Sequence, residues 1–296
     1  MRIAGRTVLP LTLAAVVFVS LAAYAQEERS GQEQHGGHDE HINPDQPDVT
    51  NGTHIVSIGL VQVELGGIYT HNTTSLHSGG TPFTVRVGLT DWVEARIGAD
   101  GLLTQTADGV PASGFGNVQL GAKLRLWAKP GGIPAMSVLP TVNLPSASRE
   151  KGLGSGSVDF GIAVLTGTDI GPRGHIDVNY GIASVGPDSG LPRFSQHLLS
   201  TSISAAATAR WNPYIEVFWF SRTEADQRSE ASFDGGAIYE IGPRLAIDGG
   251  VQAGVSGPAA GLAVFGGVSI VFGPGPDAVH ARQRRPHPTT TRSAGT

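Results

Sequence analysis

The sequence predicts an all-β fold, an up-and-down antiparallel transmembrane β-barrel of about twelve strands, and three observations predict it. Between residues 51 and 273, apolar and polar residues alternate with a period of two in one segment after another. The connections between these segments are alternately long and short. After the first 25 residues, no apolar run approaches the roughly 20 residues that a membrane-spanning helix needs. We therefore expect strands to cross the membrane.

An export signal is predicted at the N-terminus. Two arginines in the first six residues precede the apolar run Leu9–Ala23, and Ala23-Tyr24-Ala25 supplies the small residues at which signal peptidase cleaves. Cleavage is expected between Ala25 and Gln26. The apolar run has about 15 residues, too few for a membrane anchor helix, which is the competing interpretation. Because the chain has no cysteine, neither a lipoprotein anchor nor a disulfide is available.

The regions flanking the barrel are predicted to be disordered. Residues 26–50 are polar and are predicted to form a periplasmic tether. Residues 274–296 are rich in Pro, Thr and Arg and are predicted to form a basic tail. The spacing of His35, His38 and His41 is a weak candidate for zinc or copper binding. A floppy segment must be ordered before it binds metal, so a solvated linker is favoured and no metal or cofactor is predicted.

The composition narrows the class of protein. The chain has 42 glycines, 19 prolines and only 15% charged residues, which suits many short strands separated by turns. Its formal net charge of −5 does not indicate the basic surface that a nucleic-acid-binding protein needs.

Residues 117–127 show the alternation most clearly. Five apolar residues from Val118 to Leu126 face one way, and five polar or glycine residues from Asn117 to Arg125 face the other. A helix would scatter these residues around its surface, whereas a strand sorts them completely. The other predicted strands are 61–65, 83–89, 93–99, 136–144, 158–166, 176–182, 197–208, 214–221, 233–241, 245–252 and 262–272.

The connections sort by length. Long polar stretches are expected at 71–81, 104–116, 145–157, 184–196 and 222–232. Short turns are expected at 90–91, 129–132, 171–174, 211–213 and 242–244, and the eleventh strand departs from the rule with only 256–260 after it. This order is typical of a barrel whose N-terminus begins in the periplasm, with short turns inside and long loops outside.

A soluble β-sandwich also alternates, so the polar face decides between the two classes. An exposed sheet in water usually carries many Lys and Glu residues, whereas here Gly, Ser, Thr and Asn dominate, as expected of a crowded lumen.

Aromatic residues provide a further indication of an outer-membrane barrel. Phe272 is the last residue of the last predicted strand and resembles the signal recognised by the barrel-assembly machinery, although 24 residues follow it. Trp92, Trp127 and Trp211 lie near predicted turns and suit an interfacial girdle, whereas Trp219 is placed mid-strand.

Inward-facing charges are the candidate functional residues, because such charges set selectivity in a pore. The pairs Arg86 with Glu94, and Arg96 with Lys123 or Glu64, lie on neighbouring predicted strands. Equally, such pairs only satisfy buried polar groups if the barrel is too narrow to conduct. The complete set is Glu64, Arg86, Glu94, Arg96, Lys123, Arg125, Asp159, Asp177, Glu216, Asp234 and Glu240.

Five short segments follow one another along the chain in an order that matches known motifs. Asp45–Thr50 is similar to a T-D-R-P-D-x-T stretch, Gly59–Gly66 to a G-x-x-Q-x-E-x-G strand, and Arg86–Glu94 to an R-x-G-x-T-D-x-x-E hairpin. Gly116–Lys123 is similar to a G-D-x-x-x-G-x-K strand, and Leu139-Pro140 with Pro145-Ser146 to a drifted L-P-T-G segment. In these motifs the chain resembles a known outer-membrane family, "putative MetA-pathway of phenol degradation", whose members are often labelled transporters. The resemblance covers about residues 42–272. Gln46 replaces the usual Arg and Asn117 the usual Asp, which leaves open any charge pair between these sites.

The resemblance implies passage of hydrophobic or aromatic compounds across the outer membrane of a Gram-negative cell. We therefore expect a monomeric barrel that passes small solutes passively, with membrane lipid, a solute and the assembly machinery as partners. No catalytic constellation is present in the sequence, so an enzyme is not expected. The alternatives are a structural or adhesive barrel without conductance and a soluble periplasmic β-protein.

Overall fold

The computed structural model describes residues 41–47, 49–73, 76–107, 109–128, 133–187, 191–257 and 261–274. The expected signal peptide with its cleavage site, the part of the tether before residue 41 and all but the start of the tail lie outside these residues. Within them, no helix is long and apolar enough to cross a membrane.

Every regular element of the described chain is a β-strand, and the strands form one sheet. Their bounds are β1 Val61–Thr73, β2 Leu76–Gly80, β3 Phe83–Thr90, β4 Val93–Ala99, β5 Leu102–Ala107, β6 Val110–Phe115, β7 Val118–Trp127, β8 Ala135–Leu144, β9 Asp159–Ile170, β10 Gly174–Val185, β11 Phe194–Ala205, β12 Trp211–Phe220, β13 Glu230–Gly242, β14 Leu245–Ser256 and β15 Leu262–Phe272.

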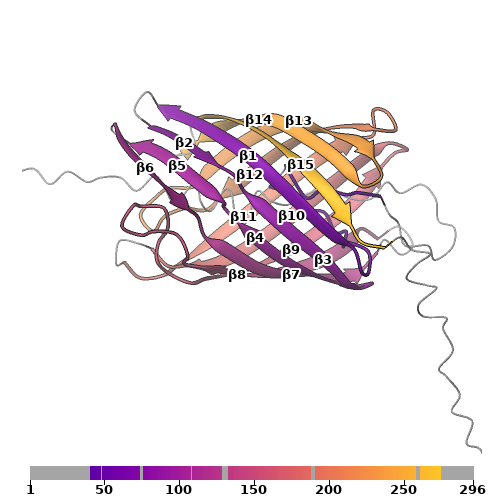
Figure 1. Ribbon diagram of the computed structural model, residues 1–296, viewed down its shortest axis with the longest axis horizontal. Coiled ribbons are helices and arrows are strands. Elements are labelled where there is room, and N and C mark those ends of the chain that lie inside the picture. Colours follow the sequence, from indigo (N-terminus) through magenta and orange to yellow (C-terminus); the bar gives the residue numbers. More distant parts are fainter. Residues whose placement is uncertain are drawn as a thin grey trace, which may run out of the picture.

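Twelve of these strands close into a barrel (Figure 1). The order around the wall is β1, β3, β4 and then β7 to β15, and each strand is antiparallel to its neighbours. The last strand closes on the first, with Val61 opposite Phe272 and His71 opposite Leu262. The predicted all-β, up-and-down barrel is therefore confirmed.

The three remaining strands extend the wall beyond the closed barrel, at the left-hand end in Figure 1. The far part of β1 pairs with β2, and β2 continues through β5 to β6. Pro82, which has no N–H to donate, separates β2 from β3, and Gly101, with a φ of 66°, separates β4 from β5. The long polar connections expected at 71–81 and 104–116 are therefore largely strands, whose backbone groups pair with one another and with β1.

The other connections follow the predicted order of lengths. One end of the barrel has the short connections 91–92, 128–134, 171–173, 206–210 and 243–244, and we call it the short-turn end. The opposite, long-loop end has 145–158, 186–193 and 221–229 and, as the exception, 257–261. One expected turn is misplaced, because residues 211–213 belong to β12 and the turn precedes them.

Alternation places apolar side chains outside and polar ones inside. In β7, Leu120 and Leu126 are 42% and 52% exposed, whereas Gln119 and Lys123 are 4% and 0% exposed. Such an outer face suits lipid, and all backbone groups of a closed cylinder are paired.

Exposed aromatic residues mark both ends of the outer face. Trp92, Trp127 and Trp211 are exposed near the short-turn end. Trp219 is also exposed, but it lies next to the last residue of β12 and so near the long-loop end, not at mid-strand. Phe272 is the last residue of β15 and is half exposed.

Candidate functional site: a segment inside the barrel

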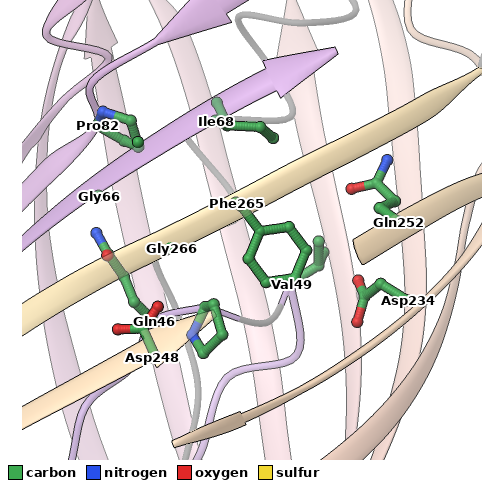
Figure 2. A pocket seen from close by; sticks show the side chains of 12 residues that line it. Gln46, Val49, Gly66, Ile68, Pro82, Asp234, Asp248, Gln252, Phe265 and Gly266 are labelled. Carbon is green, nitrogen blue, oxygen red and sulfur yellow. The ribbon is translucent and has the colours of Figure 1, made fainter. Parts of the chain in front are cut away.

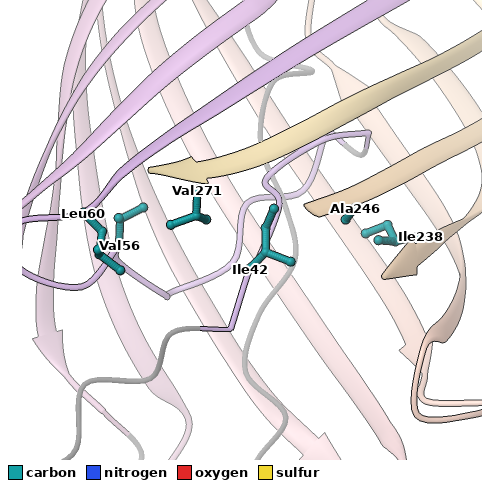
Figure 3. Close-up of a cluster of buried hydrophobic side chains, with 6 residues drawn as sticks. All are labelled: Ile42, Val56, Leu60, Ile238, Ala246 and Val271. Atoms are coloured by element: carbon teal, nitrogen blue, oxygen red, sulfur yellow. The ribbon is translucent and has the colours of Figure 1, made fainter. Parts of the chain in front are cut away.

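Residues 41–47 and 49–60, which we call the inner segment, lie inside the barrel before the first strand begins. The backbone N–H of Ile42 donates to the carbonyl of Pro243, in a turn at the short-turn end, at 2.6 Å. Figure 3 shows Ile42, Val56 and Leu60 of this segment facing the interior of the wall. They form one buried apolar cluster with Ile238, Ala246 and Val271 from β13, β14 and β15.

The expectation of a disordered tether through residue 50 does not hold for residues 41–47, 49 and 50. Asp45 and Thr50 are fully buried, and Val49 is 2% exposed. The expected start of the barrel at residue 51 also shifts, since the first strand begins at Val61. The inner segment carries no period-two pattern because, apart from a single bridge between Ile58 and Gly88, it contacts side chains of the wall and does not form a strand.

Asp45 lies at the centre of an ion network on one wall. Its carboxylate accepts hydrogen bonds from Arg96 and, at 3.1 and 3.2 Å, from the Nζ of Lys123, and it lies 3.3 Å from Nη1 of Arg86. The three cations come from β4, β7 and β3, which are neighbours in the barrel. All four side chains are buried. Charged groups so close together in the interior need compensation by opposite charges.

Two glutamates of the wall complete this compensation. Glu64 and Glu94 each accept a hydrogen bond from Arg86 at 3.0 Å, and Glu94 also lies 3.1 Å from Nε of Arg96. Three carboxylates, counting Asp45, therefore face three cations. The predicted pair of Arg86 with Glu94 is present, whereas Arg96 and Lys123 meet through Asp45.

The same glutamates also bind the backbone of the inner segment. Glu64 accepts from the N–H groups of Asp45 and Gln46 at 3.0 to 3.1 Å, and Glu94 accepts from that of Val56 at 2.7 Å. Buried N–H groups without strand neighbours need such partners. Wall carboxylates thus take the place of a neighbouring strand.

The opposite wall holds the segment through Glu216 of β12. Its carboxylate accepts from the N–H groups of Val49 and Thr50 at 2.8 and 2.5 Å, and from the hydroxyl of Thr50. The side chain of Val49 packs in a buried cluster with Leu198, Phe218 and Phe220. In the barrel order, five strands separate β4 from β12 in either direction. The inner segment therefore crosses the whole lumen.

A small pocket lies between the inner segment and the wall formed by β1, β13, β14 and β15 (Figure 2). Its cavity volume is about 40 Å³. Cavities that admit benzene are nearer 150 Å³, so an aromatic ring enters only if the segment moves. The side chains around it are Gln46, Pro47, Val49, Ile68, Pro82, Asp234, Asp248, Gln252 and Phe265.

Three other predicted charges lie away from the Asp45 network. Asp159 accepts a hydrogen bond from the N–H of Gly186 at 2.7 Å and lies 3.4 Å from Arg193. Asp177 lies 3.4 Å from Nε2 of His175. Arg125 is half-buried near the end of β7. None of these contacts involves the inner segment.

The last two predicted charges are on β13. Asp234 is buried directly opposite Glu216 in the strand register and lines the pocket. Glu240 accepts a hydrogen bond from Asn212 at 2.9 Å and lies 3.3 Å from Nδ1 of His41. Of the three histidines considered for metal, His35 and His38 lie outside the described residues. Among those described, no group of three or more potential ligands is placed to hold a metal ion.

Sequence reasoning missed Asp45, Gln46 and Val49, because the polar residues around them indicated a tether. The signal that pointed to them was the short motif 45–50. The two departures from the family motifs, Gln46 and Asn117, have different surroundings and do not contact each other. The amide oxygen of Asn117 accepts a hydrogen bond from the N–H of Ala147 at 3.1 Å, whereas the side-chain oxygen of Gln46 lies against Gly66 and Gly267.

The closed wall, its apolar outer face and its polar interior define an outer-membrane type of β-barrel. The chain belongs to the family described as "Putative MetA-pathway of phenol degradation", whose model matches residues 44–272. A search of curated proteins finds no match.

Two solved structures resemble the fold. The COG4313 outer membrane channel from Pseudomonas putida F1 is 12% identical, with a TM-score of 0.60, and the match covers 74% of this chain and 97% of that one. The NanC porin is 11% identical, with a TM-score of 0.52, and the match covers 70% of this chain and 98% of that one. At these identities, the likeness concerns the fold.

Proposed function

We propose that this protein is a channel in the outer membrane of a Gram-negative cell, through which small solutes pass passively, and that the inner segment moves to let them through. The observation that carries the proposal is the way the lumen is closed. Strands of the wall hold one another by continuous backbone ladders. The inner segment between residues 43 and 56 is bound by side chains and two small apolar clusters, and its backbone–backbone bonds to the wall lie at its ends, at Ile42 and at residues 58–60. Such contacts break without opening the barrel itself.

Hydrophobic or aromatic solutes are the proposed class. Apolar side chains face the lumen beside the charges, including Leu198, Phe218 and Phe220 on one side and Ile68 and Phe265 on another. Once the inner segment leaves, these side chains provide contacts for an apolar solute. Membership of this family, together with the likeness in fold to a channel and a porin, favours transport over catalysis.

The test is single-channel conductance of the purified protein in planar bilayers, together with swelling of liposomes in sugars and in small aromatic solutes. Transport predicts transient openings and faster entry of the aromatic solutes. A barrel that folds, as shown by heat-modifiable migration in gels, and yet never conducts or swells would favour the structural or adhesive alternative. Flotation with outer membranes tests the location, and a chain that stays monodisperse without detergent would exclude it.

A further inference from the structure

A buried carboxylate lacks a hydrogen-bond donor in the pocket between the inner segment and the wall (Figure 2). Asp248 extends from β14, and both of its carboxylate oxygens are buried. Neither oxygen accepts a hydrogen bond from any residue that the structure describes. Burying a carboxylate in this way is unfavourable unless a partner compensates it. A positively charged group or a hydrogen-bond donor beside Asp248 would therefore stabilise its carboxylate.

The positive charges of the lumen are already committed elsewhere. Arg86, Arg96 and Lys123 lie on β3, β4 and β7 and bind the three carboxylates described above. The charges near Asp248 are negative: Glu64 acts on it as a like charge, and Asp234 lines the same pocket. This part of the wall therefore has excess negative charge.

Other acceptors converge beside Asp248. The side-chain oxygen of Gln46, the carbonyl oxygen of Leu65 and Oδ2 of Asp248 all lie 2.8 to 2.9 Å from the point where a Cβ on Gly267 would stand. All three atoms are hydrogen-bond acceptors. The missing side chain of Gly267 leaves the space that brings them together. A group with several N–H donors matches this arrangement better than a group with one.

Apolar side chains form another part of the pocket, beside Asp234 and Gln252. The ring of Phe265 lies over the backbone of Gly250, where a Cβ would come within 2.6 Å of its Cζ, so the ring faces the lumen. Figure 2 shows this ring beside Val49, with Asp248 on one side of the ring and Asp234 on the other. An aromatic face attracts a cation, which adds to the attraction of Asp248.

We propose that this pocket binds a small organic cation with an ammonium or guanidinium head, whose charge pairs with Asp248 and whose carbon atoms contact Phe265 and Val49. The cavity of about 40 Å³ is large enough for a head group, and a small displacement of the inner segment exposes the oxygens of Asp248, which are buried in the closed arrangement. A larger apolar body requires the segment to move. The assignment rests on the proposed function in one respect, namely that solutes reach the lumen.

The experiment measures binding separately from passage. Saturation-transfer NMR on the full purified chain in detergent compares three probes of similar size: methylammonium, methanol and acetate, with a detergent-only blank. Methylammonium is expected to receive saturation from the protein, and methanol and acetate much less. The variants Asp248→Asn, which removes the charge, and Gln46→Arg, which supplies an internal cation, should each weaken methylammonium binding at least tenfold. The matched control Asp177→Asn removes another inward-facing acid and should leave binding unchanged.

Several results would overturn the proposal. Equal saturation of methanol means that a neutral donor suffices, and displacement of methylammonium by equimolar potassium means a site for inorganic cations. Unchanged binding in both variants means that Asp248 is not the partner. If Asp248→Asn fails to show heat-modifiable migration, Gln46→Arg decides. A barrel that binds methylammonium through Asp248 but never conducts refutes transport alone, and a conducting barrel without binding refutes this site alone.

Discussion

Removal of the charge of Asp45 is the most direct perturbation of the closed lumen. The substitution Asp45→Asn keeps the shape of the side chain but leaves three buried cations facing two carboxylates, Glu64 and Glu94. Breaking a buried ion pair by removing one partner costs about 3–5 kcal/mol, because the remaining charge is left uncompensated. If the inner segment leaves the lumen, water reaches these cations and relieves that cost. The substitution therefore destabilises the closed arrangement relative to the displaced one.

The expected size of the effect follows from this difference. A change of about 3–5 kcal/mol corresponds to roughly two to four powers of ten in the equilibrium between the two arrangements. The bonds of Glu216 to Val49 and Thr50 remain, as do the apolar clusters around Ile42 and Val49. We therefore expect frequent excursions of the segment rather than its permanent expulsion.

Amide hydrogen exchange, read by mass spectrometry on peptides that cover residues 41–60, measures these excursions. Exchange in this segment should accelerate by two or more powers of ten, while peptides from β10 and β12 stay protected. Openings in planar bilayers should become correspondingly more frequent. The control is Asp91→Asn in an exposed turn, which should change neither the exchange of residues 41–60 nor the frequency of openings. Unaltered exchange of residues 41–60 would refute the reasoning, and so would an equal acceleration in β12, because that pattern means general unfolding.

Three further predictions concern separate features. Cysteines introduced at Thr53 and Ser137, where the serine hydroxyl donates to the threonine backbone carbonyl at 2.7 Å, should abolish openings when a short bis-methanethiosulfonate joins them through two disulfides. Reduction should restore the openings, as measured by bilayer conductance in a chain that otherwise has no cysteine. Gly101→Val places a Cβ 1.9 Å from the carbonyl oxygen of Thr81 at a φ of 66°, so limited proteolysis should cut the β5–β6 extension while the barrel keeps its heat-modifiable migration. Leu120→Arg puts a charge on the outer face of β7 and should lower the free energy of unfolding in urea titrations, by at most the roughly 2–4 kcal/mol that arginine costs at the middle of a bilayer.

The wall was predictable because lipid and lumen impose opposite demands on successive residues. Leu120 and Lys123 differ in exposure as their positions in the alternation require, and nothing beyond the strand period is needed to sort them. The inward position of a charged residue follows from the same period. The residue that pairs with such a charge does not follow from the strand period, because Asp45 lies 51 residues from Arg96 and 78 from Lys123 in the sequence. No local pattern encodes such a distance.

The inner segment was unpredictable for a different reason. Polar sequence without periodicity usually remains disordered, because it buries too little apolar surface to offset the loss of conformational entropy. Here the wall supplies what the segment lacks. Glu64, Glu94 and Glu216 accept its N–H groups, and the clusters around Ile42 and Val49 add a few buried side chains. Order in this segment therefore depends on the surrounding barrel, and a reading of the segment alone misses it.

The distribution of charge in the lumen explains why the wall and the inner segment depend on each other. Without Asp45, the wall of β3, β4 and β7 carries Arg86, Arg96 and Lys123, and only Glu64 and Glu94 compensate them. The facing wall of β12 to β14 carries Glu216, Asp234 and Asp248. One side of an emptied lumen is thus net positive and the other net negative, and water must hydrate both. The inner segment brings Asp45 to the positive side and N–H donors to Glu216 on the negative side, whereas Asp248 stays without a donor. Closure therefore compensates the positive wall and part of the negative one, and water or solute must take over these contacts when the segment is displaced.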